Sequence, residues 1–274
     1  MLRKLAQIIA PAALALGMTT ARPAHAEGDV KVLVLKEHGI GTASAAQAYV
    51  DKLIAAVAQQ NGWTSAAGKY TTSRSAAETW IKANAPSYAI MSLAAYLGLR
   101  KEHGLTVVGQ AVVKSAGGRQ YFIISNSATD LAGCKGKTLA TDHADDPRFI
   151  ETVVADGDFK LADFTMVETR RPVQTLKAVI RGEAVCALVD DAQMDSLSTV
   201  EGGGSVKTAW SSSKLPPMVV VAFKGVSNGE KTAFRTNLGQ VCIGAGKEAC
   251  DEAGISSLRP STDVSYSKLV KAYD

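Results

Sequence analysis

Short apolar runs alternate with amphipathic segments through the first hundred residues, and this order restricts the fold more than any other feature of the sequence. The predicted strands are residues 30–36, 69–73 and 87–92, and the predicted helices are residues 43–60, 75–84 and 93–104. In residues 43–60, Tyr49, Val50, Leu53, Ile54 and Val57 fall on one helical face. A repeated strand–helix order predicts a parallel sheet with crossover helices.

The same unit occurs a second time. After extended segments at residues 106–113 and 119–125, the predicted strands are residues 137–141, 164–169 and 184–191, and the predicted helices are residues 147–156, 172–180 and 191–199. In the helix that starts at Pro172, we expect Val173, Leu176, Val179 and Ile180 to point inward. A further extended pair follows at residues 208–212 and 218–223, and we expect the C-terminal tail to be mostly helical.

Two such units in one chain predict an α/β protein with two lobes, each built on a sheet with a parallel core. The candidate crossover segments lie near residues 119–127 and 211–222. This organisation assigns residues 27–122 and 220–274 to lobe 1, and residues 123–219 to lobe 2. A chain that crosses between two lobes and returns leaves a cleft between them, and such interfaces are a common place for ligand pockets.

The first 26 residues have the layout of a cleaved secretory signal. MLRK is basic, LAQIIAPAALALGM is an apolar run too short to span a bilayer comfortably, and Ala24-His25-Ala26 is a small-residue cleavage site. An uncleaved anchor is the alternative reading, which the short run and the cleavage site disfavour. We therefore expect a periplasmic protein that begins at Glu27.

The charge balance of the exported part gives no general reason to expect a nucleic-acid partner. The leader holds three of the 30 basic residues and none of the 26 acidic ones, so residues 27–274 carry a net charge near +1. Binding to nucleic acid or to anionic lipid usually requires a clear excess of basic residues.

All four cysteines lie in the exported part, where disulfides can form. Four cysteines permit three pairings. Because Cys242 and Cys250 are close in sequence, we expect them to pair, which leaves Cys134 for Cys186. Free buried cysteines are the alternative, and zinc is less expected because no C-x-x-C spacing is present.

Ligands of open α/β sheets lie beyond the carboxyl ends of the strands. This rule selects six short segments, three in each half of the chain: residues 37–42, 73–75, 92–93, 142–148, 170–171 and 190–192. Two of the three histidines that follow the leader, His38 and His143, occupy corresponding loops in the two halves. Asp146 precedes Pro147 and reads as a helix N-cap.

Five stretches of the sequence resemble the phosphate/phosphite/phosphonate type of periplasmic substrate-binding protein from ABC importers. They are PSYAIMSLAAYL, LAGCKGKTLATDHADDPRF, LKAVIRGEAVCALVDD, LPPMVVVAFKG and ISSLRPSTDVSYSKLVKAY, and the resemblance covers essentially the whole exported chain. The resemblance implies a type II periplasmic binding protein fold without catalysis or cofactor. It also implies a small-molecule ligand and an inner-membrane ABC permease as partners, and we expect a monomer.

The chain departs from that family in one loop. Where the family commonly has a segment rich in serine, threonine and glycine, this chain has Thr141-Asp142-His143-Ala144-Asp145-Asp146. Each carboxylate about 4 Å from an oxyanion costs on the order of 4 kcal/mol at an effective dielectric near 20. A cationic ligand is therefore an alternative to an anion.

Three chemistries can use these loops, and together they define the candidate ligand-binding residues: Glu37, His38, Thr42, Ser92, Thr141, Asp142, His143, Arg170 and Asp191. Histidine, arginine and hydroxyl groups suit an oxyanion. Histidine with carboxylate suits a metal ion or a cationic solute. Hydrolysis is the third chemistry and lacks an evident nucleophile.

We therefore predict an exported solute-binding protein that captures a small phosphate- or phosphonate-like oxyanion for an ABC importer. The alternatives are a binding protein for a metal ion or cationic solute, and a ligand sensor or hydrolase.

Overall fold

The computed structural model describes residues 29–38, 43–114 and 117–274. The predicted leader and Thr42 lie outside these ranges. Among the described residues, no helix combines the length and the apolar character that a membrane span requires.

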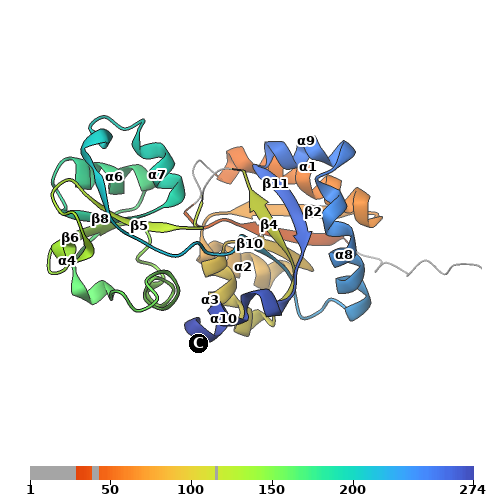
Figure 1. Cartoon of the computed structure of the whole chain (residues 1–274). Coiled ribbons are helices and arrows are strands. Elements are labelled where there is room, and N and C mark those ends of the chain that lie inside the picture. The colour runs from red at the N-terminus through yellow and green to blue at the C-terminus, as the bar shows by residue number, and fades with distance from the viewer. Residues whose placement is uncertain (1–28, 39–42, 115–116) are drawn as a thin grey trace, which may run out of the picture.

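Two mixed sheets organise the chain (Figure 1). In the first, strands follow the order β11-β4-β10-β3-β1-β2, and in the second the order is β7-β6-β8-β5-β9. The pairs β1–β2, β1–β3, β6–β7 and β6–β8 are parallel. The predicted α/β fold with two parallel cores is confirmed, and antiparallel strands extend both sheets.

Lobe 1 is the six-stranded sheet with the helices that cover it (Figure 1). Its strands are β1 (Val30–Leu35), β2 (Ala66–Thr71), β3 (Tyr88–Met91), β4 (Thr106–Val113), β10 (Met218–Ala222) and β11 (Ile255–Pro260). Its helices are α1 (Ala43–Asn61), α2 (Arg74–Asn84), α3 (Leu93–His103), α8 (Asn228–Val241), α9 (Lys247–Glu252) and α10 (Ser267–Tyr273). The buried side chains on the two faces of the sheet belong to separate hydrophobic clusters, so the lobe has three layers.

Lobe 2 is the five-stranded sheet with its helices (Figure 1). Its strands are β5 (Tyr121–Ser125), β6 (Thr138–Thr141), β7 (Thr165–Glu168), β8 (Cys186–Asp190) and β9 (Lys207–Ser211). Its helices are α4 (Leu131–Cys134), α5 (Pro147–Phe149) continued by the π-helix η1 (Ile150–Val154), α6 (Pro172–Ile180) and α7 (Asp191–Leu197). One of its hydrophobic clusters is continuous with the core of lobe 1, through Tyr121 and Phe149 among others.

The chain passes from the first sheet to the second between β4 and β5, and it returns between β9 and β10. Hydrogen bonds tie the two passages together, because the Leu215 amide donates to the Arg119 carbonyl and Arg119 Nε donates to the Leu215 carbonyl at 3.3 Å. The two connections therefore run side by side at the junction of the lobes.

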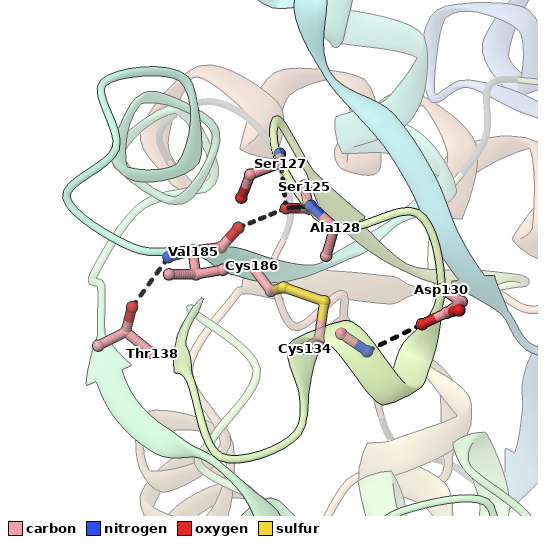
Figure 2. Close-up of a disulfide and its surroundings, with 9 residues drawn as sticks. Ser125, Ser127, Ala128, Asp130, Cys134, Thr138, Val185 and Cys186 are labelled. Carbon is pink, nitrogen blue, oxygen red and sulfur yellow. Dashed lines mark hydrogen bonds between the residues drawn. A yellow bond between two sulfur atoms is a disulfide. The ribbon is translucent and has the colours of Figure 1, made fainter.

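Both predicted disulfides are confirmed. Cys134–Cys186 joins α4 to β8 inside lobe 2, and Cys242–Cys250 joins the end of α8 to α9. Figure 2 shows the first bond beside Ser125, whose hydroxyl donates to the Val185 carbonyl at 2.6 Å and accepts from the Ala128 amide at 2.9 Å. The disulfide thus anchors a segment that is also held by local hydrogen bonds.

Several local expectations are wrong. Tyr49 and Val173 are 46% and 49% exposed, although both were expected on buried helix faces. Residues 147–156 were expected to form one α-helix, but only the first three are α-helical and a π-helix follows. The C-terminal tail also contains a strand, β11, which pairs with β4 and forms an edge of the sheet.

Candidate functional site

A pocket of about 260 Å³ lies where the carboxyl ends of strands from both sheets face each other. Its lobe 1 side is formed by residues after β1, β2 and β3, including Lys36, His38 and Arg74. Its lobe 2 side is formed by residues after β6 and at the end of β8, including His143 and Asp190. We call this the interlobe pocket.

Arg74 connects the two lobes at this pocket. It is the first residue of α2, whose N-cap is Ser73. Its Nε and Nη2 donate to the two carboxylate oxygens of Glu37 at 2.7 and 3.1 Å, and its Nη1 donates to Asp146 Oδ2 at 2.8 Å. A planar guanidinium suits this fork geometry, because its donors match a carboxylate in pairs. Burial opposes the charge of Arg74, but the two carboxylates outweigh burial and raise its pKa.

The space for this guanidinium depends on a glycine. A Cβ atom added at Gly98 of α3 would lie 2.6 Å from Arg74 Nη1, a distance that real Cβ atoms essentially never show. The missing side chain on α3 therefore lets the arginine reach across to lobe 2.

Asp146 is the N-cap of α5, as predicted, and it has a second role. Its Oδ1 accepts the Phe149 amide at 3.0 Å, while its Oδ2 accepts from Arg74 and from the Tyr273 hydroxyl at 3.1 Å. The cap therefore also binds α2 and α10 of lobe 1.

Ser92 and Glu37 meet on the lobe 1 side. Ser92 is the N-cap of α3 and its hydroxyl donates to Glu37 Oε2 at 3.0 Å. Glu37 is 8% exposed, and its carboxylate is satisfied by Arg74 and Ser92. Burying a carboxylate without such partners would be costly.

His38 reaches from lobe 1 toward two carboxylates of lobe 2. Its Nε2 lies 3.4 Å from Asp145 Oδ1, and its Nδ1 lies 3.9 Å from Asp142 Oδ2. Its φ of 57° lies in the left-handed region, which non-glycine residues rarely adopt and which is found at functional sites. Burial lowers the pKa of His38, but Asp145, Asp142 and Glu37 together outweigh burial and raise it above its usual value.

This shift predicts how stability changes with pH. A histidine whose pKa is raised on folding stabilises the protein below its unfolded pKa near 6.5, and the contribution is lost as pH rises through the folded pKa. The pKa of Asp145 is lowered against its own burial by His38, so the pair contributes from above about pH 4 upward until His38 deprotonates. Because the Asp145 side chain is 62% exposed, we expect at most about 1 kcal/mol.

The measurement is chemical denaturation of the wild type and of His38→Gln from pH 5 to pH 8, a range that brackets the unfolded pKa of histidine near 6.5. We expect the stability difference between wild type and variant to shrink as pH rises. A difference that grows with pH would contradict the assignment of His38 as a cation between the lobes.

His143 and Asp142 are buried on the lobe 2 side. Asp142 accepts from Thr175 Oγ1 at 2.8 Å and from Gln193 Nε2 at 3.0 Å, and it does not line the interlobe pocket. His143 is 3% exposed, lines the pocket, and places Nε2 2.9 Å from Gln193 Oε1. Its ring lies 4.3 Å from the ring of His38. The two histidines predicted in corresponding loops therefore meet across the lobes.

Asp190 and Asp191 accept hydrogen bonds from backbone amides of the segment that leads into β5. Asp190 is the N-cap of α7 and also accepts the Gly118 amide at 3.1 Å. Asp191 accepts the Arg119 amide at 3.2 Å. Burial and the neighbouring charge of Asp190 raise the pKa of Asp191 against these hydrogen bonds.

The predicted ligand residues thus divide into two groups. Glu37, His38, Ser92 and His143 line the interlobe pocket. Thr141, Asp142, Arg170 and Asp191 do not line it. The Thr141 side chain is fully buried and accepts the His143 amide, and Arg170 is exposed to solvent ahead of α6.

Sequence reasoning missed three cationic residues of the pocket: Lys36, Arg74 and Arg119. Arg74 lies inside the segment 73–75, which the strand-end rule selected for its serines. Its signal was that it is the one charged residue of that segment. Arg119 lies in a crossover segment, where the strand-end rule does not apply.

Among the residues that the structure describes, no group of three or more histidine, cysteine, aspartate or glutamate residues is arranged to hold a metal ion.

Comparison with known proteins identifies related sequences and folds. A sequence model of the family described as "ABC transporter, phosphonate, periplasmic substrate-binding protein" matches residues 41–266. No curated protein sequence matches the chain.

Three solved structures share the fold over most of their length. A binding protein component of an ABC phosphonate transporter from Pseudomonas aeruginosa is 15% identical with a TM-score of 0.64, covering 89% of this chain and 86% of its own. PhnD1 from Prochlorococcus marinus, in complex with methylphosphonate, is 10% identical with a TM-score of 0.65, covering 89% and 96%. The aliphatic sulphonate binding protein SsuA from Escherichia coli is 9% identical with a TM-score of 0.57, covering 90% and 85%. At these identities the likeness concerns the fold.

Proposed function

The chain belongs to the family of periplasmic phosphonate substrate-binding proteins of ABC transporters, and from this premise we propose that its interlobe pocket captures a small phosphorus oxyanion. The family works with a small-molecule ligand and a membrane permease. We extend these properties to this chain, which we propose to be exported by its leader, to act as a monomer, and to bind its ligand without turnover.

The pairing of charges in the pocket is the observation that carries the proposal. Four carboxylates line the pocket, and each has a partner: Glu37 and Asp146 pair with Arg74, Asp145 with His38, and Asp190 with backbone amides. Lys36 and Arg119 also line the pocket, and neither forms an ion pair with a carboxylate of the described residues. Two cations are therefore available for an anionic ligand, while each carboxylate that lines the pocket already has an ion-pair or hydrogen-bond partner.

This arrangement also accounts for the acidic loop after β6. A carboxylate repels an oxyanion only to the extent that its charge is not compensated nearby. Asp142 is held by Thr175 and Gln193 behind the pocket wall, and Asp146 is held by Arg74. A cationic ligand would have to displace these partners, whereas an anionic ligand would not.

We further propose that the two sheets with their helices move as rigid lobes about residues 117–120 and 212–217. A ligand that contacts both sides of the pocket prefers the closed arrangement and shifts the population toward it. The contacts from Arg74 to Asp146 and from His38 to Asp145 join the two lobes, so they stabilise the closed arrangement even without a ligand.

Neutralising the two available cations tests this function. We expect Lys36→Gln and Arg119→Gln each to weaken methylphosphonate binding by about 10- to 100-fold, because each removes one charge-assisted contact worth roughly 1.5–3 kcal/mol. The measurement is isothermal titration calorimetry with methylphosphonate.

Matched controls are Lys207→Gln and Arg259→Gln, which remove the same charges at exposed positions on β9 and β11. Equal losses in the pocket and control variants would show that only net charge matters. Unchanged binding in both pocket variants would contradict the proposed anion site.

A further inference from the structure

The tautomer of one histidine in the interlobe pocket follows from the hydrogen bonds of its neighbours. His143 lines the pocket, and its Nε2 lies 2.9 Å from Gln193 Oε1. Which imidazole nitrogen carries the proton depends on which end of the Gln193 amide faces it.

The orientation of Gln193 is fixed by three further contacts. Its Oε1 accepts the Asp190 amide at 3.0 Å, which an amide nitrogen could not do. Its Nε2 donates to Asp142 Oδ1 at 3.0 Å and to the Pro172 carbonyl at 3.2 Å, which an oxygen could not do. Since Oε1 is an acceptor, Nε2 of His143 must donate to it.

In the neutral ring of His143, Nδ1 is consequently an acceptor. This nitrogen forms no hydrogen bond with any other residue that the structure describes. The ring is held edge-on to Tyr121, with centroids 5.3 Å apart, and lies 4.3 Å from the ring of His38. This acceptor therefore belongs to a residue that lines the lobe 2 side of the pocket, and the ring of His38 faces it from lobe 1.

We propose that His143 is a specificity-determining residue that selects a singly protonated phosphorus oxyanion, and that Gln193 is its positioning residue. The proposal rests on the proposed function of the pocket. The acid hydrogen of such a ligand donates to His143 Nδ1, while its charged oxygens face Lys36, Arg119 and His38. A sulfonate has the same shape and charge but no acid hydrogen, so its oxygen would meet the Nδ1 lone pair.

The first test concerns the ring itself and needs no ligand. Long-range ¹H–¹⁵N spectra of the exported protein report the tautomer of each of its three histidines, His38, His103 and His143. We expect His143 to be protonated on Nε2 and not on Nδ1. A spectrum that places its proton on Nδ1 would overturn the proposal.

The second test compares two ligands of nearly equal shape, methylphosphonate and methanesulfonate, at a pH where methylphosphonate is a monoanion. We expect the wild type to bind methylphosphonate about 10- to 100-fold more tightly, because an acceptor that meets no donor leaves a desolvated polar atom unpaired. Equal binding of the two ligands would overturn the role of His143 and leave the proposed function standing. Binding of neither ligand, with either tautomer, would overturn both.

Two variants of similar size distinguish the effect of the acceptor atom on ligand preference from the effect of side-chain shape. Asparagine can place its Oδ1 near the position of Nδ1, whereas leucine offers no acceptor. We expect His143→Leu to reduce the preference to less than about threefold and His143→Asn to restore most of it. A preference that survives His143→Leu would overturn the proposal.

The role of Gln193 is tested by Gln193→Met, which removes both ends of the amide. We expect the phosphonate preference to fall about fivefold or more, together with a mixture of His143 tautomers in the spectrum. A purely structural role would weaken both ligands equally and leave their ratio unchanged, which would overturn the assignment of Gln193. If this variant does not fold, the wild-type spectrum and the His143 pair still decide the proposal.

Discussion

Replacing Arg74 with glutamine lowers the free energy of unfolding by about 3–5 kcal/mol, the largest effect that we expect for a charged residue of this protein. The substitution leaves Glu37 and Asp146 without their cation, and the side chains of both are at most 10% exposed. An uncompensated buried carboxylate costs far more than the pair itself contributes. For a chain of this size the melting temperature falls by roughly 10 °C.

Urea denaturation of Arg74→Gln, Arg74→Lys and the double variant Arg74→Gln/Glu37→Gln measures this effect. We expect the stability of Arg74→Lys to lie between those of the wild type and Arg74→Gln, because lysine keeps the charge but lacks the paired N–H donors of the guanidinium. The double variant should recover part of the loss, since it removes one of the two unpaired carboxylates. A change within about 0.5 kcal/mol for Arg74→Gln, like that expected for the exposed Arg259→Gln, would show that Arg74 does not link the lobes.

Replacing Cys134 and Cys186 together with alanine destabilises the protein by about 4 kcal/mol. The bond closes a loop with a sequence separation of 52, and the entropy that it removes from the unfolded chain grows with loop length. The same relation gives about 2.5 kcal/mol for Cys242–Cys250, whose separation is 8. Both members of the first pair are fully buried, so alanine also loses some packing.

Thermal denaturation of the two double-alanine variants checks the order of these effects. Because the first bond lies wholly within lobe 2, its loss should lower the stability of that lobe first. Equal destabilisation by the two double substitutions would contradict an explanation based on loop length.

The architecture could be predicted because it depends on local patterns. Short apolar runs such as residues 30–35 and amphipathic segments such as residues 43–61 appear in the sequence with little ambiguity, and their alternation implies parallel pairing. The disulfides followed from the number and spacing of the cysteines.

The strand β11 was missed for a physical reason. Its buried residues, Ile255 and Leu258, are three positions apart, because the pairing with β4 is irregular between Ile255 and Ser257. A bulge removes the period of two by which a strand is recognised in sequence.

The site was predictable in position but not in its charge pairing. The rule that ligands lie beyond strand ends selected the loops of His38, Ser92 and His143, which line the interlobe pocket. Arg74 and Asp146 pair at 2.8 Å although they are 72 residues apart, and that contact depends on how the lobes face each other. Similarly, Asp142 follows a strand but turns toward Thr175 and Gln193 behind the pocket wall.

The most direct test of the account is a calorimetric titration of the protein, exported with its own leader and purified without added ligand. The protein is first refolded in the presence of a chelator. Methylphosphonate, phosphate, zinc and a small amine are then titrated separately. We expect saturable binding of one phosphorus oxyanion per chain, weakened in Arg119→Gln. Binding of zinc or the amine alone, with no response to any phosphorus oxyanion, would contradict the proposed anion site.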